Sequence, residues 1–346
     1  MTLFFGIKIK AFFALNLYFW FFCFSKFKLK CRYLNYLLFL EKFKPFFEIK
    51  NNILNSKMLK GSIVAIFFLI CLVSSSTPSF LGVSSDPFNQ TLATKFWYLC
   101  MGSYCAPSRV AAWDLGFVSD LYPYVTDLTL IINSTGNACG FTAYNPPEDE
   151  VLIIFRGTEP LSIKNWIDDI DTLFTDYPGC PGCKVHEGFY HTYLQVKDEI
   201  LASAKILFAK YPTSKKLVTG HSLGGALAIH ASVDIIQQFG KIDHFYTFGS
   251  PRVGNQQFAN FVNEINENYM SRITHYKDPV PHLPLEAWGF YHIDREIFFN
   301  QDNTDFTICK QGEDDSCSNS MLDIFVGDHL NYMGKDIVLY FLGCQL

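Results

Sequence analysis

Four residue types are missing from the first 57 residues of this 346-residue chain, which contain no aspartate, valine, glutamine or histidine. Phenylalanine, leucine, lysine, asparagine, isoleucine and tyrosine dominate there instead. A composition so unlike that of the remaining chain excludes this segment from the main folded domain. We interpret residues 1–57 as a spurious or non-mature extension and Met58 as the true start. A Phe-rich, membrane-associated extension is the alternative, because Ala11–Phe24 is strongly apolar.

The segment after Met58 lacks the length of a membrane span. Its apolar run extends only from Ile63 to Val73 and ends in three serines, whereas a transmembrane helix needs about 20 residues. Lys60 precedes the run, and a positive start, a short apolar core and a small-residue exit are typical of a secretory signal peptide. We therefore expect a signal peptide over 58–76 and no stable membrane span in the mature chain.

Positive charge is scarce after residue 76. Residues 1–76 contain 11 basic and 2 acidic residues of the totals of 28 and 33, so 17 basic and 31 acidic residues remain, a net charge of −14. Such a surface repels nucleic acid and anionic bilayers at long range. The charge balance therefore favours an uncharged substrate and excludes a nucleic-acid partner.

Repeats, low-complexity linkers and Pro/Gly-rich seams are also absent, so we expect one domain over 77–346. Apolar runs alternate with helical patterns, and the central runs are apolar throughout, which is typical of a mostly parallel α/β sheet covered on both faces. The predicted strands are 125–132, 140–144, 151–155, 217–220, 245–248, 273–276 and 297–299. The predicted helices are 90–101, 188–209, 225–238, 256–267 and a segment after His329.

Cysteines are not scarce, and eight follow the expected cleavage site: Cys100, Cys105, Cys139, Cys180, Cys183, Cys309, Cys317 and Cys344. An even number in a secreted chain predicts disulfides. The C-x-x-C pair at 180 and 183 has no second C-x-x-C or paired histidine, so we expect a small loop disulfide and no metal site. Sequons at Asn89 and Asn133 predict N-glycosylation.

Gly220-His221-Ser222-Leu223-Gly224 fits G-x-S-x-G, the turn that presents the nucleophilic serine of α/β-hydrolases. A predicted strand precedes it and a predicted helix follows. The N–H of Leu223 lies in the first helical turn, where backbone donors have no internal partner, so it can stabilise an oxyanion. Thr158, which follows another predicted strand, is the candidate for the second donor. His221 is expected to be structural.

A nucleophilic serine needs a base and an acid that orients it, in the chain order Ser, Asp or Glu, His. Asp278 follows a predicted strand at the carboxyl end of the sheet, where such sites form, whereas Asp234 lies in a helix that leads away. Position favours His329, at a loop-to-helix junction, over His292 at a strand start, and both remain candidates for the base.

Ile163, Trp166, Ile167 and Ile170 recur at i, i+3, i+4 and i+7, which places them on one face of a helix. Polar residues fill the intervening positions. One interpretation is a surface helix packed on the core. The other is an amphipathic lid that covers the site in water and turns its apolar face to lipid.

Seven segments resemble, in order, those of the class 3 lipases, the secreted filamentous-fungal triacylglycerol lipases and their animal relatives. They are Ile154–Thr158, Ile163–Ile167, Lys184–Phe189, Thr219–Ala226, Phe248–Gly254, Asp278–Pro284 and Asp328–Tyr332. The resemblance covers nearly all of 89–346 and implies an α/β-hydrolase fold.

The resemblance implies a triad of Ser222, Asp278 and His329, an oxyanion hole formed by the N–H groups of Thr158 and Leu223, and a lid carrying Trp166. Several members have Ser where position 158 is Thr, which keeps a hydroxyl. The resemblance also suggests the disulfides Cys105–Cys344 and Cys309–Cys317.

The leading hypothesis is a secreted enzyme, extracellular or in the secretory–lysosomal lumen, that cleaves neutral-lipid esters at a lipid–water interface. It would act through an acyl-enzyme and need no cofactor. The alternatives are a soluble carboxylesterase or feruloyl-type esterase, a phospholipase A1, and an inactive lipid-binding protein.

Overall fold

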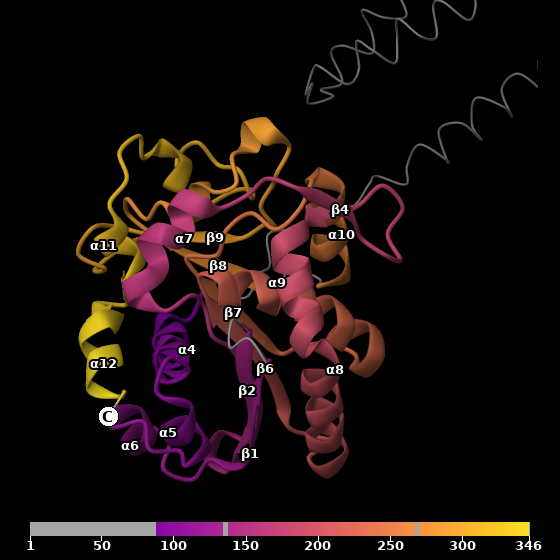
Figure 1. Cartoon of the computed structure of the whole chain (residues 1–346), viewed down its shortest axis with the longest axis vertical. Coiled ribbons are helices and arrows are strands. Elements are labelled where there is room, and N and C mark those ends of the chain that lie inside the picture. Colours follow the sequence, from indigo (N-terminus) through magenta and orange to yellow (C-terminus); the bar gives the residue numbers. More distant parts are fainter. Residues whose placement is uncertain (1–87, 134–137, 267–269, 346) are drawn as a thin grey trace, which may run out of the picture. The chain divides into compact units, whose positions relative to one another are not determined.

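The computed structural model describes residues 88–133, 138–266 and 270–345. The expected extension (1–57) and signal peptide (58–76) lie outside these residues. The described part is built on an eight-stranded sheet of order β1-β2-β3-β6-β7-β8-β9-β10 (Figure 1). Its strands are β1 Thr126–Ile132, β2 Cys139–Asn145, β3 Glu150–Phe155, β6 Lys215–His221, β7 His244–Phe248, β8 Met270–His275, β9 Glu296–Phe299 and β10 Phe306–Ile308.

Strands β3, β6, β7, β8 and β9 are parallel to their neighbours in that series, whereas β1, β2 and β10 extend the two edges by antiparallel pairing. This arrangement confirms the predicted mostly parallel α/β sheet. The ends of the seven predicted strands agree within two residues except at the start of β8, which begins three residues early at Met270, and the edge strand β10 was not predicted. β8 stops at His275, one residue before the predicted end. Tyr276 has φ +35°, a conformation that a strand does not accommodate.

Helices cover both faces of the sheet (Figure 1). One face carries α4 Gln90–Gly102, α5 Pro107–Ala111, α6 Phe117–Leu121 and α12 Ile337–Gly343, and the other carries α8 Glu187–Lys210, α9 Leu223–Phe239 and α10 Gln256–Ile265. Short elements lie in the connections: α7 Ile163–Asp169, α11 Val326–His329, and the hairpins β4 Phe174–Asp176 with β5 Lys184–His186 and β11 Asn331–Tyr332 with β12 Lys335–Asp336. Among the described residues, no helix is long and apolar enough to cross a membrane.

The two helical layers explain why β3 is apolar at nearly every position. Leu152 and Ile154 pack into the core beneath α4, whereas Ile153 and Phe155 pack into the core beneath α8 and α9. A strand buried on both faces needs apolar residues throughout. This double cover holds β3 and β6 rigidly, and the site is built where these strands end.

Three of the expected disulfides are present: Cys105–Cys344, Cys180–Cys183 and Cys309–Cys317. The expectation that Cys100 and Cys139 also form disulfides is wrong, because both are buried free thiols. Cys100 Sγ lies 3.3 Å from Thr219 Oγ1 in β6, and burial raises its pKa to about 12. An even number of cysteines therefore does not establish that each has a partner.

The disulfide that joins distant parts of the chain should contribute most to stability. Replacing Cys105 and Cys344 by serine should lower the free energy of unfolding by about 2–5 kcal/mol, because the bond closes a long loop in the unfolded chain. The Cys309–Cys317 bond closes a loop of only 8 residues, so its removal should cost less. Urea unfolding of the two double variants measures both values. Equal losses would contradict the loop-length argument.

Candidate active site

Ser222 stands between β6 and α9 with φ +59° and ψ −131°, a conformation that is strained for any residue with a side chain. Its neighbours must be small. A Cβ at Gly220 would lie 2.2 Å from the Gly224 carbonyl oxygen, and a Cβ at Gly224 would lie 2.4 Å from that of Phe155. The G-x-S-x-G pattern is therefore a steric requirement of this turn.

Asp278 and His329 meet beside this turn. His329 Nδ1 lies 2.9 Å from Asp278 Oδ2 and 3.0 Å from Oδ1, and both side chains are buried. The Val280 N–H donates to Oδ1 at 2.8 Å and the Tyr332 hydroxyl donates to Oδ2. Burial alone raises the pKa of Asp278, but His329 and these hydrogen bonds outweigh it and lower the pKa below its ordinary value.

An ionised Asp278 fixes the tautomer of His329. Because the carboxylate can only accept, Nδ1 carries the proton and Nε2 offers its lone pair. His329 Nε2 and Ser222 Oγ are both buried, and neither has a hydrogen-bond partner among the described residues. These are the two atoms between which a serine triad transfers its proton.

His221 connects the serine turn to His329. Its Nε2 lies 2.9 Å from the His329 carbonyl oxygen, which can only accept, so Nε2 carries the proton and Nδ1 accepts from the Tyr104 hydroxyl at 2.8 Å. Burial, reinforced by His329, holds the pKa of His221 well below its ordinary value. His221 is therefore a neutral support, in keeping with the expected structural role.

The loop after β3 lies directly against the nucleophile. A Cβ at Gly157 would be 2.9 Å from Ser222 Cβ and 2.4 Å from the His221 carbonyl oxygen. Thr158, the next residue, is half-buried, and Leu223 is the first residue of α9. The two expected oxyanion donors thus come from segments that flank Ser222.

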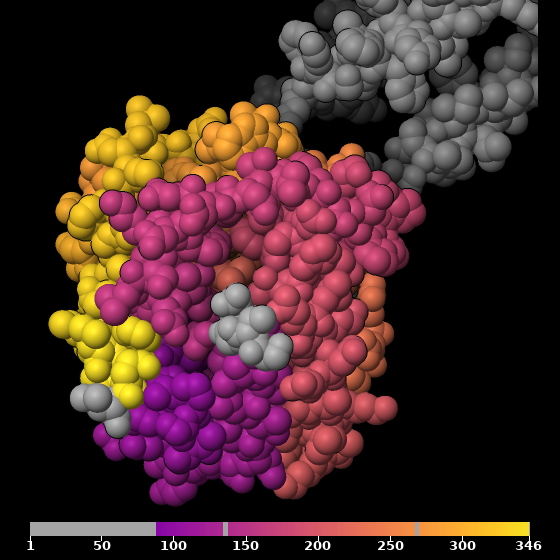
Figure 2. Space-filling view, viewed as in Figure 1, coloured from indigo at the N-terminus to yellow at the C-terminus, as the bar shows by residue number. Residues whose placement is uncertain are grey.

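The apolar stripe on α7 faces the protein. Ile163 is buried, Trp166 and Ile167 are half-buried, and the polar residues Lys164, Asn165, Asp168 and Asp169 are exposed. Ile170 was expected on the same helix face, but it follows the end of α7 in an extended conformation and is half-buried there. The Trp166 ring stacks on Phe189 of α8, with centroids 6.1 Å apart. In the space-filling view, the segment around α7 joins the C-terminal residues on one side and α8 on the other (Figure 2).

The other candidates for acid and base are engaged elsewhere. His292 Nε2 donates to the Pro281 carbonyl oxygen at 2.7 Å, and Asp234 accepts from Tyr193 and Lys197. Tyr332 is a contact of Asp278 that the sequence reasoning missed, although it lies only three residues after His329. A group of possible metal ligands, Glu296, Cys309 and Cys317, is ruled out because its sulfurs form a disulfide.

Comparison with known proteins agrees with this geometry. The family model "Lipase (class 3)" matches residues 152–288. A lipase of Rhizomucor miehei is 37% identical over 253 residues, which are 70% of this chain and 68% of that one. The chain belongs to the class 3 lipases. It is therefore a carboxylic ester hydrolase.

Solved structures extend the similarity to the fold. Lipase II from Rhizopus niveus has a TM-score of 0.66 and 30% identity, covering 71% of this chain and 95% of that one. A triacylglycerol lipase whose catalytic centre is described as a serine protease triad has a TM-score of 0.65 and 33% identity, covering 73% and 98%. Both confirm the α/β-hydrolase fold.

The strain at Ser222 can be separated from its chemistry. Ser222→Ala and Ser222→Gly should each reduce ester hydrolysis by about four to six orders of magnitude, because both remove the nucleophile. Glycine adopts φ +59° freely, so Ser222→Gly should be more stable than Ser222→Ala by about 1 kcal/mol. Turnover assays and urea unfolding measure the two effects. Retention of a tenth of the wild-type rate would exclude Ser222 as nucleophile.

The two histidine candidates differ in the expected size of their effects. His329→Ala should reduce turnover by about four to six orders of magnitude, because the base is lost. His292→Ala removes a hydrogen bond to a loop and should reduce turnover no more than about 100-fold. Steady-state kinetics of the two purified variants decide between them, and the reverse order of effects would make His292 the base.

Proposed function

We propose that this class 3 lipase hydrolyses neutral acylglycerols at a lipid–water interface through a triad of Ser222, His329 and Asp278. The observation that carries the proposal is the buried Asp278–His329 pair beside the strained Ser222. The triacylglycerol lipase among the structural neighbours supports the same substrate class.

The reaction follows from these positions. Ser222 Oγ attacks the ester carbonyl carbon while His329 Nε2 takes its proton, and Asp278 stabilises the imidazolium that forms. The Thr158 and Leu223 N–H groups donate to the oxyanion. Collapse of the tetrahedral intermediate releases the alcohol, which takes the proton from His329. Water activated by His329 then hydrolyses the acyl-enzyme and restores Ser222.

The surface near the site supports an interfacial substrate. Exposed apolar side chains gather in the loops that carry α7, follow Asp278 and precede His329. Their exposed fractions are 66% for Leu161, 58% for Leu173, 50% for Trp288, 95% for Leu322 and 62% for Phe325. The short helices α7 and α11 in these loops lie at the same end of the sheet (Figure 1), and exposed apolar side chains that lie together are typical of an interaction surface. We propose that they rest on lipid while α7 swings away from the buried Ser222.

We also propose that the protein is secreted or enters the secretory–lysosomal lumen as a domain over 77–346. Its three disulfides support an oxidising compartment. Asn89 is exposed and uses only Oδ1 to cap α4, which leaves Nδ2 for a glycan, whereas Asn133 Nδ2 donates to Gln195. We propose Asn89 as the better of the two glycosylation sites.

The lid predicts a change of rate at the solubility limit of the substrate. Wild-type activity on a long-chain ester should rise sharply once an emulsion forms, because the interface favours the open lid. Trp166→Ala should lose much of this rise and keep most of the activity on a dissolved short-chain ester, since the indole contributes about 2 kcal/mol of apolar burial. Rate measurements across the solubility limit test this.

Ile206→Ala is the matched control, because Ile206 is an exposed apolar residue of α8 (67%) away from these loops. It should behave as wild type on both substrates. A smooth saturation curve for the wild type through the solubility limit would contradict the lid and favour a soluble esterase.

A further inference from the structure

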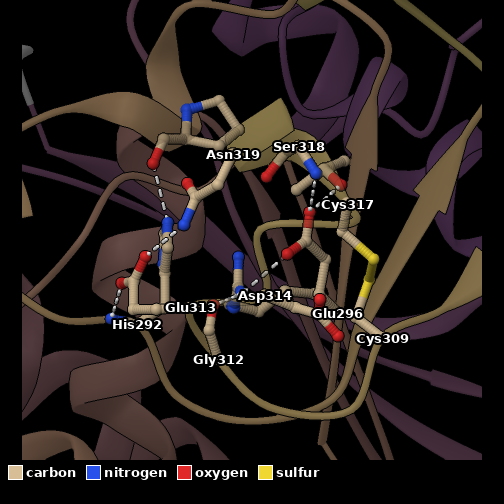
Figure 3. A network of polar contacts seen from close by, with 12 residues as sticks. His292, Glu296, Cys309, Gly312, Glu313, Asp314, Cys317, Ser318 and Asn319 are labelled. Carbon is tan, nitrogen blue, oxygen red and sulfur yellow. Dashed lines mark hydrogen bonds and ion pairs between the residues drawn. A yellow bond between two sulfur atoms is a disulfide. The ribbon is translucent and has the colours of Figure 1, made fainter. Parts of the chain in front are cut away.

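Arg252 is a buried guanidinium that the proposed reaction does not use. It follows β7 by four residues and is 3% exposed. Its Nε and Nη2 donate to Glu313 Oε1 and Oε2, both at 2.9 Å, and Nη2 also donates to Asn319 Oδ1 at 3.2 Å. Figure 3 shows Glu313 and Asn319 within this network. The planar fork is thus held on one side by a carboxylate and an amide.

The other side of Arg252 holds the segment that follows Asp278. Nη1 donates to the carbonyl oxygens of His282 at 2.7 Å and Pro284 at 3.1 Å. The Arg252 backbone N–H donates to the carbonyl oxygen of Leu283 at 2.8 Å. His292 holds the preceding carbonyl, that of Pro281. Four consecutive carbonyl groups are therefore fixed by two residues.

This segment and the acid form one local unit. The 3-10 turn Val280–His282 begins two residues after Asp278, and the Val280 N–H caps Asp278 Oδ1 at 2.8 Å. Displacement of the carbonyls at 281–284 would therefore pull on the N–H that orients the carboxylate. Misplacement of a reacting group by about 1 Å can cost about 100-fold in rate.

We propose that Arg252 and Glu313 form a positioning pair that holds the 281–284 segment and thereby keeps Asp278 aligned with His329. The inference rests on the proposed catalytic role of that triad. Neither residue contacts the reacting atoms. Both act through the backbone of the acid loop.

Glu313 has further contacts that suit it to this role. It lies between Cys309 and Cys317, and it also accepts from the His292 N–H at 2.8 Å and from Asn319 Nδ2 at 3.0 Å. Burial raises its pKa, but the Arg252 hydrogen bonds and charge, together with His292, outweigh it and hold the pKa below its usual range. Glu313 thus stays ionised at neutral pH.

Stability alone is a weak reason for such a pair. Burying a charged pair carries a desolvation cost that apolar side chains of similar volume avoid. The neighbouring buried Arg272 makes the contrast clear: it donates to the carbonyl oxygens of Ile293 and Gly312 and not to the acid loop. Of these two arginines, Arg252 is the one that donates to the segment after Asp278.

The test compares Glu313→Gln with Asp234→Asn in the full-length protein. Asp234→Asn breaks the 2.8 Å ion pair with Lys197 between α8 and α9, away from the acid loop. An aryl phosphonate that labels Ser222 counts competent sites, and kcat per site is measured on a dissolved short-chain ester. Glu313→Gln should lower kcat per site by about 10- to 100-fold with KM within about twofold. Asp234→Asn should leave both unchanged.

A second readout does not depend on turnover. The proton on His329 Nδ1 that is bound to Asp278 should give a downfield NMR signal, and it should shift or broaden in Glu313→Gln but not in Asp234→Asn. If Glu313→Gln does not fold, Asn319→Ala removes one hydrogen bond to each member of the pair and leaves the Arg252–Glu313 ion pair in place, so it should show the same changes at smaller size. An unchanged kcat per site and an unchanged signal in the Glu313 or Asn319 variant would overturn the pair. A wild type with no esterase activity would instead overturn the proposed function.

Discussion

A carboxylate with 2% of its surface exposed, Asp278, constrains much of the architecture around it. A buried negative charge is costly unless it is fully hydrogen-bonded. The Asp278 carboxylate accepts hydrogen bonds from His329, Tyr332 and the nearby Val280 N–H. The first two require the chain from 326 to 332 to pack against the loop after β8. A Cβ at Gly249 would lie 2.6 Å from Asp278 Oδ2 and 2.9 Å from His329 Nδ1. The residue that follows β7 must therefore be glycine to leave room for the Asp278–His329 pair.

The local parts of the site could be predicted from the sequence because their causes are local. The turn at Ser222 needs Gly220 and Gly224 for steric reasons that lie within five residues, so the motif records them directly. The stripe on α7 is likewise a periodicity of one helix. The placement of Asp278 followed from a buried strand that ends three residues before it.

The long-range contacts could not be predicted in this way, because no local sequence pattern indicates them. Glu313 and Arg252 are 61 residues apart, and nothing in the spacing of either indicates a bidentate pair. Cys100 and Cys139 look like any other secreted cysteines in sequence, yet one sulfur contacts Thr219 and both are free thiols. Whether these cysteines form disulfides depends on which residues pack against α4 and β2, and that is a property of the assembled fold. Parity, spacing and composition do not encode it.

We propose that α7 is a lid and that the closed site contains an unfavourable contribution that helps to open it. Ser222 Oγ and His329 Nε2 are buried without hydrogen-bond partners among the described residues, and each such polar atom costs about 1–3 kcal/mol. Meanwhile α7 hides Trp166 against Phe189, so opening in water would expose apolar surface with no compensation. At a lipid surface that apolar face gains new contacts, and the exposed Ser222 and His329 gain polar partners in the substrate. In this proposal the apolar face of α7 keeps the site shut in water and favours the open state at a lipid surface.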